Sequence, residues 1–216
     1  MFDGIDGIIW DWNGTLLDDS EMAIQVMNKI LERRNIPQLS IDLYKEVFTF
    51  PVRDYYQKIG FDFENEPFEV PASEFIVHYN ELVNSCQLHK DSVQTLTQFK
   101  NRGLSQFILS AMQQDTLNQC LERYQIASFF EYVSGLGDHY ANSKIGNGHR
   151  LISELNLNPK RILLIGDTCH DFEVAQALGC SCVLVTNGHQ SRTVLEATGA
   201  IVIDCLLDIS DLILQN

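Results

Sequence analysis

Two turns that carry aspartates are the first candidates for chemistry in this sequence. One follows a short apolar run and reads IIWDWNGT over residues 8–15, with Asp11 as its carboxylate. The other reads IGDTCHD over residues 165–171 and places Asp167 and Asp171 four residues apart. A carboxylate at the end of a buried strand can act as a nucleophile or as an oxygen ligand for a hard cation such as Mg²⁺. An ordinary Asn-Gly turn and an ordinary helix cap explain the same segments without chemistry.

A hydroxyl and a cation are candidates to join these carboxylates. Ser110 and Ala111 follow the apolar residues 107–109, so a strand there delivers a hydroxyl and backbone amides to its end. Lys144 lies in a polar segment that we expect to be a loop between a strand and a helix. Taken singly, these residues are more simply the end of a strand and a solvated surface lysine.

The elements that must position these residues follow from the apolar pattern. Short apolar runs alternate with amphipathic stretches, which is typical of a doubly wound, Rossmann-like parallel sheet with helices on both faces. Because ligands of such sheets bind at the carboxyl ends of the strands, we expect the candidate residues at one edge. The predicted strands are 7–11, 104–110, 131–134, 161–166, 181–185 and 200–203. The helices predicted in this α/β core are 91–102, 115–124, 149–155, 171–178 and 191–198.

One region breaks this alternation. We expect no buried strand between residues 17 and 87, because helical patterns fill that interval. The simplest architecture is a core formed by 1–16 and 88–216, with a small α-helical cap inserted over 17–87. Two connections, near residue 17 and near 88–90, would let the cap open and close over the strand ends. The helical patterns of the cap are 20–35, 40–48, 52–59 and 72–87.

Composition limits the partners. The 216 residues carry 15 Lys and Arg against 29 Asp and Glu, a net charge of −14. This excess repels nucleic acids and anionic membranes, and we expect a small substrate and a monomer or homodimer instead. No stretch approaches the roughly 18 apolar residues of a membrane span. The first residues lack the pattern of a signal peptide, so the six scattered cysteines predict reduced thiols in a cytoplasmic protein.

Together the four segments resemble the haloacid dehalogenase superfamily of aspartate-dependent phosphohydrolases. The motifs of that family are a strand ending D-x-D-G-T, a strand ending in Ser or Thr, a lone Lys and a strand ending G-D-x-x-x-D. They appear here in the same order, at Asp11, Ser110, Lys144 and Asp167. The helical insert looks like the cap of the phosphoglycolate phosphatase and β-phosphoglucomutase branch. The resemblance covers the whole chain and implies a Mg²⁺-dependent phosphatase that acts on a small phosphorylated metabolite.

The resemblance also implies a role for each matching residue. Asp11 would attack phosphorus and form an aspartyl-phosphate, which splits one displacement into two. Mg²⁺ would be held by Asp11, Asp167, Asp171 and the backbone carbonyl of Asn13. Catalysis of this kind is mostly positioning and charge stabilisation. The implied catalytic set is Asp11, Asn13, Ser110 and Lys144.

Substrate-binding residues are implied in both the core and the cap. The cap segment FPVRD at 50–54 looks like a specificity loop in which Arg53 touches the far end of the substrate. A guanidinium there favours a second carboxylate or phosphate, whereas an exposed arginine in a first helical turn is an equally good interpretation. In the core, the implied residues are Ser110, Ala111 and Lys144 for the phosphoryl oxygens, with Gly14 and Thr15 forming the turn.

Position 13 departs from the family pattern. The phosphatases of the family place there an Asp that protonates the leaving oxygen, whereas Asn13 can donate a hydrogen bond but cannot transfer a proton. Losing general acid and base catalysis typically slows a reaction about 10²- to 10⁴-fold. The enzyme would therefore be slow on alkyl phosphates, prefer good leaving groups or use another proton donor. The candidate donors are His139, His170 and His189, each more simply a loop histidine.

Other readings stay open because of Asn13. Phosphonoacetaldehyde hydrolases lack that Asp and use a Schiff-base lysine of the cap, for which Lys29, Lys45 and Lys58 are the candidates. True dehalogenases have an aromatic residue at this position and need no metal, and the presence of both Asp167 and Asp171 argues against them. A binding or regulatory protein that keeps the metal site but turns over poorly is a further alternative.

Overall fold

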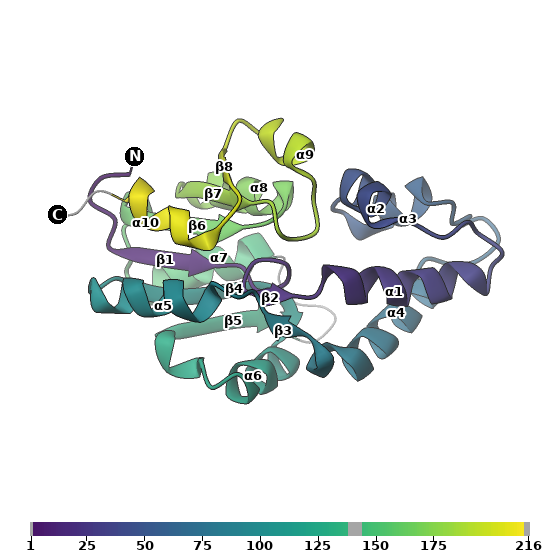
Figure 1. Cartoon of the computed structure of the whole chain (residues 1–216), viewed down its shortest axis with the longest axis horizontal. Helices are drawn as coiled ribbons and strands as arrows, with labels where there is room; N and C mark the ends of the chain where they lie inside the picture. Colours follow the sequence, from purple (N-terminus) through teal and green to yellow (C-terminus); the bar gives the residue numbers. More distant parts are fainter. Residues whose placement is uncertain (1, 138–143, 214–216) are drawn as a thin grey trace.

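The computed structural model describes residues 2–137 and 144–213. Figure 1 shows an α/β core at one end of the molecule and four helices beyond it. The core is a six-stranded sheet in which every pairing is parallel. This confirms the predicted doubly wound α/β fold. In spatial order the strands are β5 (Tyr132–Leu136), β4 (Ser105–Gln113), β1 (Gly7–Trp10), β6 (Ile162–Gly166), β7 (Ser181–Val185) and β8 (Ile201–Ile203).

The two central strands, β1 and β6, are buried along their whole length because helices cover both faces of the sheet. On one face Trp10 stacks on Phe99, with ring centroids 5.9 Å apart. On the other face Ile9 and Leu164 pack in a second apolar cluster. The core helices are α5 (Ser92–Asn101), α6 (Gln114–Arg123), α7 (Lys144–Glu154), α8 (Cys169–Leu178), α9 (Arg192–Glu196) and α10 (Ile209–Leu212).

Two core elements differ from the sequence prediction at positions that matter for the site. Helix α7 is described from Lys144 onward, so Lys144 is helical, whereas the sequence predicts a loop there and a helix only from residue 149. Gly146 and Gly148 weaken the helical signal in the sequence. In the structure Gly148 allows close packing of α7, because a Cβ there would lie 2.7 Å from Leu178 Cδ1. Strand β4 runs on to Gln113, so Ser110 lies inside the strand and not at its end.

The insert between β1 and α5 is helical, as the sequence predicts. Its helices are α1 (Ser20–Glu32), α2 (Ile41–Val47), α3 (Val52–Lys58) and α4 (Glu69–Leu82). Helices α1 and α4 run side by side, and α2 and α3 lie across from them (Figure 1). The short 3₁₀ segments of the chain are η1 (Val83–Ser85), η2 (Ala127–Phe129), η3 (Pro159–Arg161) and η4 (Leu206–Asp208).

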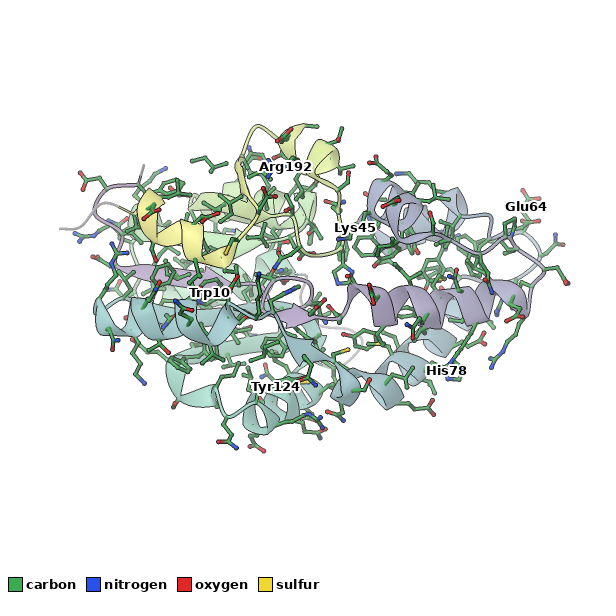
Figure 2. All side chains as sticks on the ribbon, viewed as in Figure 1. Trp10, Lys45, Glu64, His78, Tyr124 and Arg192 are labelled. Carbon is green, nitrogen blue, oxygen red and sulfur yellow. The ribbon has the colours of Figure 1, made fainter. Side chains whose placement is uncertain are left out.

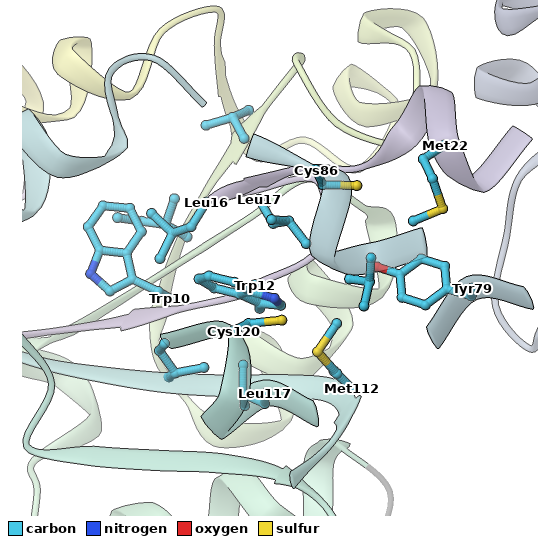
Figure 3. Close-up of a cluster of buried hydrophobic side chains, with 14 of the residues drawn as sticks. Trp10, Trp12, Leu16, Leu17, Met22, Tyr79, Cys86, Met112, Leu117 and Cys120 are labelled. Atoms are coloured by element: carbon cyan, nitrogen blue, oxygen red, sulfur yellow. The ribbon is translucent and has the colours of Figure 1, made fainter. Parts of the chain in front are cut away.

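A two-stranded antiparallel ladder joins the two connections between core and cap. Strand β2 (Leu17–Asp18) pairs with β3 (Gln87–Leu88), so both hinge segments lie side by side. The sequence does not predict this pairing, because two-residue strands carry no alternating pattern. Figure 3 shows Trp12, Cys86, Met112 and Tyr79 gathered at this junction, where the apolar cluster of the core continues into the cap.

In the described ranges, no helix has both the length and the apolar character needed to cross a membrane.

Candidate active site

Asp11 follows β1 directly and is fixed by the edge of the sheet. Its backbone N–H donates to the carbonyl of Ile165 in β6, at 2.8 Å. The carboxylate is buried, and its two oxygens have different partners. Oδ1 accepts a hydrogen bond from Lys144 Nζ, and Oδ2 accepts one from Thr15 Oγ1 at 3.2 Å. The carboxylate is therefore held in one orientation at the end of the central strand.

Two further carboxylates converge on Asp11. Asp167 follows β6 and accepts from Thr15 Oγ1 at 3.2 Å and from the His189 backbone N–H at 2.6 Å. Asp171, in the first turn of α8, accepts from Lys144 Nζ at 2.5 Å. One oxygen each from Asp11, Asp167 and Asp171 lie within 4.8 Å of one another. A compact set of carboxylate oxygens is the donor chemistry that Mg²⁺ prefers, so these residues fit that cation.

Burial sets the protonation of this cluster. Burial raises the pKa of Asp11 to about 6, although the Lys144 ammonium acts in the opposite direction. Burial likewise raises the pKa of Asp167 to about 8, and the charges of Asp11 and Asp171 add to the rise. For Asp171 burial is outweighed by Lys144 and Thr168, which hold its pKa below the ordinary value. A divalent cation at this cluster therefore competes with protons for Asp11 and Asp167.

Gly14 forms the tight turn between Asp11 and the cap. Its φ is +72°, in the left-handed region, and a Cβ there would lie 2.6 Å from the ring of His189 and would also overlap the Asp167 carboxylate. The Gly14 N–H donates to Asp19 Oδ1 at 2.8 Å. Only glycine therefore lets the turn pass between the Asp167 carboxylate and the His189 ring.

The Asn13 amide points into a network at the base of the cap. Its Nδ2 donates to Asp19 Oδ2 at 2.9 Å and to the Tyr79 hydroxyl at 2.6 Å. The Tyr79 hydroxyl in turn donates to the same Asp19 oxygen, at 2.5 Å. The Asn13 amide is therefore fixed by the Asp19 carboxylate and the Tyr79 hydroxyl. In this position it donates hydrogen bonds but has no acidic proton to transfer.

Asp19, with the Tyr79 and Tyr44 hydroxyls of the cap, belongs to a buried network beside the site that the motif reasoning missed. Asp19 is 1% exposed, and His189 Nε2 lies 3.2 Å from its Oδ1. Burial alone would lower the pKa of His189, but the Asp19 carboxylate and its hydrogen bond, with Asp167 and Asp11, raise it to about 9. On the other ring nitrogen, Nδ1, His189 meets the Tyr44 hydroxyl of α2 at 2.8 Å. The only sequence signal was the position of Asp19 shortly after the NGT turn.

Other predicted site residues lie in less direct positions. Ser110 is fully buried in β4 and its Oγ accepts from the Met112 N–H at 3.0 Å, while Ala111 lines the cavity described below. His170 stacks on Phe50 of the cap, with ring centroids 4.8 Å apart. His139 lies outside the described residues.

Arg53 is not brought to this group. Its guanidinium lies over the rings of Phe63 and Phe68, 4.8 and 5.8 Å from their centroids, in a separate shallow pocket of the cap. Arg53 is not among the described residues that line the cavity at the carboxylates, and its contact with the far end of a substrate stays a prediction.

A cavity of about 970 Å³ lies between cap and core and opens onto Asp11, Asp167 and Asp171. The contacts that close the cap over it include the Tyr44 contact with His189, the hydrogen bond from the Gln190 amide to the Phe48 carbonyl at 2.7 Å, and the one from the Ser191 N–H to the Lys45 carbonyl at 3.0 Å. Figure 2 shows Lys45 where α2 faces the core. Among the described lining residues there is none of the cap lysines, Lys29, Lys45 and Lys58, that a Schiff-base mechanism requires.

Comparisons with known proteins agree with this geometry. The family model for haloacid dehalogenase-like hydrolases matches residues 8–185. A phosphoglycolate phosphatase from Aliivibrio fischeri is 22% identical over 199 residues, which are 88% of this chain and 87% of that protein. The pyrophosphatase PpaX from Anoxybacillus flavithermus is 24% identical over 176 residues, 81% of this chain and 80% of that protein.

A solved structure shares the fold. It is described as a predicted phosphatase from Clostridium acetobutylicum, with a TM-score of 0.82 and 18% identity over 96% of this chain and 97% of its own. The match to the family model contains the whole carboxylate cluster and Lys144. The chain therefore belongs to the haloacid dehalogenase-like hydrolase family, as the sequence motifs predict.

Proposed function

We propose that this protein is a Mg²⁺-dependent phosphatase that hydrolyses a small phosphorylated metabolite through a phosphoryl group on Asp11. The observation that carries the proposal is the contact of Lys144 Nζ with both Asp11 and Asp171 inside a buried carboxylate cluster. A lysine in that position offsets the charge that otherwise repels a phosphate. The names of the two relatives, a phosphoglycolate phosphatase and a pyrophosphatase, support the same chemistry.

Each residue around Asp11 then has a separate role in the reaction. Lys144 and Thr15 orient the Asp11 carboxylate, one of whose oxygens bonds to phosphorus as the bond to the leaving oxygen breaks. Water then attacks the same phosphorus, phosphate leaves, and the carboxylate is regenerated. Ala111 and Lys144, which line the cavity at the edge of the sheet, would face the phosphoryl oxygens, whereas the Met112 N–H is bonded to Ser110 Oγ.

Asp11, Asp167, Asp171 and the Asn13 carbonyl are the groups that would hold Mg²⁺. When bound, the cation supplies positive charge beside the transferred phosphoryl group. The role of Asp167 is supported by its fixed orientation, because Thr15 and the His189 N–H each engage one of its oxygens. A cytoplasmic, reducing setting is part of the proposal, and it is supported by the six cysteines, none of which forms a disulfide.

Acetyl phosphate hydrolysis, measured with and without Mg²⁺, tests this function. We expect turnover only with the metal, loss of turnover in Asp11→Asn, and little change in Asp18→Asn, which alters an exposed carboxylate seven residues away. Mass spectrometry of acid-quenched enzyme should find one phosphoryl group on the peptide that contains Asp11. Equal turnover by the wild type and Asp11→Asn, or no turnover with any phosphate ester, contradicts the proposal.

A further inference from the structure

The cap wall of the cavity is apolar and aromatic. Helix α4 presents one stripe of residues to it at helical spacing, and α1, α2 and α3 add further apolar side chains. Ile76 belongs to this stripe and is 53% exposed. The cap residues of the lining are Ala23, Met27, Tyr44, Phe48, Phe50, Val52, Tyr55, Tyr56, Phe68, Ala72, Phe75, Ile76, Tyr79 and Asn80.

Among the lining residues that the structure describes, the cavity offers no spare positive charge to the part of a substrate beyond its phosphate. Of the cationic groups in the described lining, Lys144 is held by Asp11 and Asp171, and His189 is held by Asp19. His170 lies 3.0 Å from a Glu173 oxygen. A second carboxylate or phosphate on the substrate would therefore lose hydration without gaining an ionic partner among these residues, which is unfavourable.

The core side of the cavity adds a second constraint. Asn13 lies beside the nucleophile and its amide is committed to Asp19 and Tyr79, so it gives no proton to a leaving oxygen. A leaving group that departs unprotonated must be the anion of a fairly acidic hydroxyl. A phenol meets this need, with a pKa of about 10 like that of a tyrosine side chain, whereas aliphatic alcohols are far weaker acids.

We propose that the substrate is the phosphate monoester of an uncharged aromatic alcohol of the phenol type. Its ring packs against the aromatic and aliphatic wall of the cap, and its phosphate meets Asp11 and Lys144. The bond between phosphorus and the phenolic oxygen breaks as Asp11 bonds to phosphorus, and the phenolate keeps the electron pair and takes its proton from water. A cavity of about 970 Å³ holds a ring-bearing ester of this kind. This inference rests on the proposed phosphatase function.

Three esters that differ in one property each test the inference. Phenyl phosphate is the reference, cyclohexyl phosphate keeps an uncharged ring but has a poor leaving group, and 4-carboxyphenyl phosphate keeps the leaving group but adds a charge. We expect kcat/KM for phenyl phosphate to exceed the value for cyclohexyl phosphate by about a hundredfold or more. It should exceed the value for 4-carboxyphenyl phosphate by about tenfold.

A matched pair of variants tests the wall itself. Ile76→Gln puts a neutral polar group into the cavity wall, whereas Val77→Gln changes an equally exposed neighbour, 56% exposed, that is not among the described lining residues. We expect Ile76→Gln to raise KM for phenyl phosphate about tenfold and to affect acetyl phosphate, which has no ring, much less. Val77→Gln should change neither substrate.

The outcomes separate the two proposals. If acetyl phosphate is hydrolysed but the charged or the cyclohexyl ester is used as well as phenyl phosphate, the substrate inference is wrong and the phosphatase function stands. The substrate inference is also wrong if Ile76→Gln behaves like Val77→Gln. If no ester and no acetyl phosphate is hydrolysed, the phosphatase function itself is wrong.

Discussion

The amide nitrogen of Asn13 lies 2.9 Å from Oδ2 of the buried Asp19, where the family pattern has an acid in place of the amide. An Asn13→Asp substitution would set a second carboxyl against Asp19, and mutual repulsion would favour its protonated form. We expect kcat/KM for alkyl phosphates to rise about tenfold or more, and kcat/KM for aryl phosphates to change little. A series of esters whose leaving groups differ in pKa measures this effect. The plot of log kcat/KM against the pKa of the leaving group should have a shallower slope in the variant.

Asn80→Asp is the control for this substitution, because Asn80 lines the same cavity but lies on α4, away from Asp19. It should leave the slope unchanged. If Asn13→Asp brings no gain on alkyl phosphates, another group already delivers the proton.

His189 predicts how stability depends on pH. Its pKa rises from 6.5 to about 9 in the folded protein, since the Asp19 carboxylate outweighs the effect of burial. A raised histidine pKa stabilises the fold fully below the unfolded value and loses this effect as the pH rises through 9. Without metal, we expect the loss of the His189 proton by itself to lower the free energy of unfolding by on the order of 3 kcal/mol between pH 6.5 and 9.

Urea denaturation across that pH range, compared with His189→Gln, isolates this effect. Asp167, whose pKa is about 8, also loses its proton as the pH rises, and this too lowers the free energy of unfolding. The wild-type curve alone therefore does not separate the effects of the two groups. His149→Gln, at an exposed helical position, should reproduce the wild-type curve. A His189→Gln curve parallel to the wild type from pH 6.5 to 9 contradicts the assigned pairing with Asp19.

The Gly14 turn predicts a substitution that damages both fold and metal site. Gly14→Ala and Gly103→Ala place an alanine at nearly the same φ, +72° and +73°, but only at Gly14 does the Cβ meet other atoms within 4 Å. Gly103→Ala should cost about 1–2 kcal/mol of stability from backbone strain alone. Gly14→Ala should cost several kcal/mol more and weaken Mg²⁺ binding, because Asp167 must move.

Calorimetric titration with Mg²⁺ and denaturant unfolding of both variants give the two readouts. Equal losses in the two alanine variants would show that backbone strain alone explains the position, and that Asp167 and His189 do not constrain the turn.

The sequence predicted the nucleophile strand and the carboxylates because these residues end apolar runs of a parallel sheet. Asp11 and Asp167 follow neighbouring strands, so the fold class alone brings them together. Asp19 and Tyr79 meet across 60 residues, and no local pattern records that contact. The orientation of the Arg53 side chain depends on its packing against Phe63 and Phe68. Both rings lie outside the 50–54 segment, so that motif does not predict the orientation.

Replacing Lys144 should strongly lower the stability of the fold. Its ammonium is the cation between Asp11 and Asp171, and all three side chains are buried. Removing one partner of a buried ion pair typically costs about 3–5 kcal/mol, because the remaining charges stay desolvated. We expect Lys144→Met to lose this stability and all turnover at neutral pH, whereas Lys160→Met, at an exposed position, loses neither.

Protonation of the unpaired carboxylates in Lys144→Met should recover much of the stability near pH 5, since burial favours their neutral form. A Lys144→Met protein equally destabilised at pH 5 and pH 8 would mean that the loss comes from packing of the lysine stem and not from the charge it neutralises.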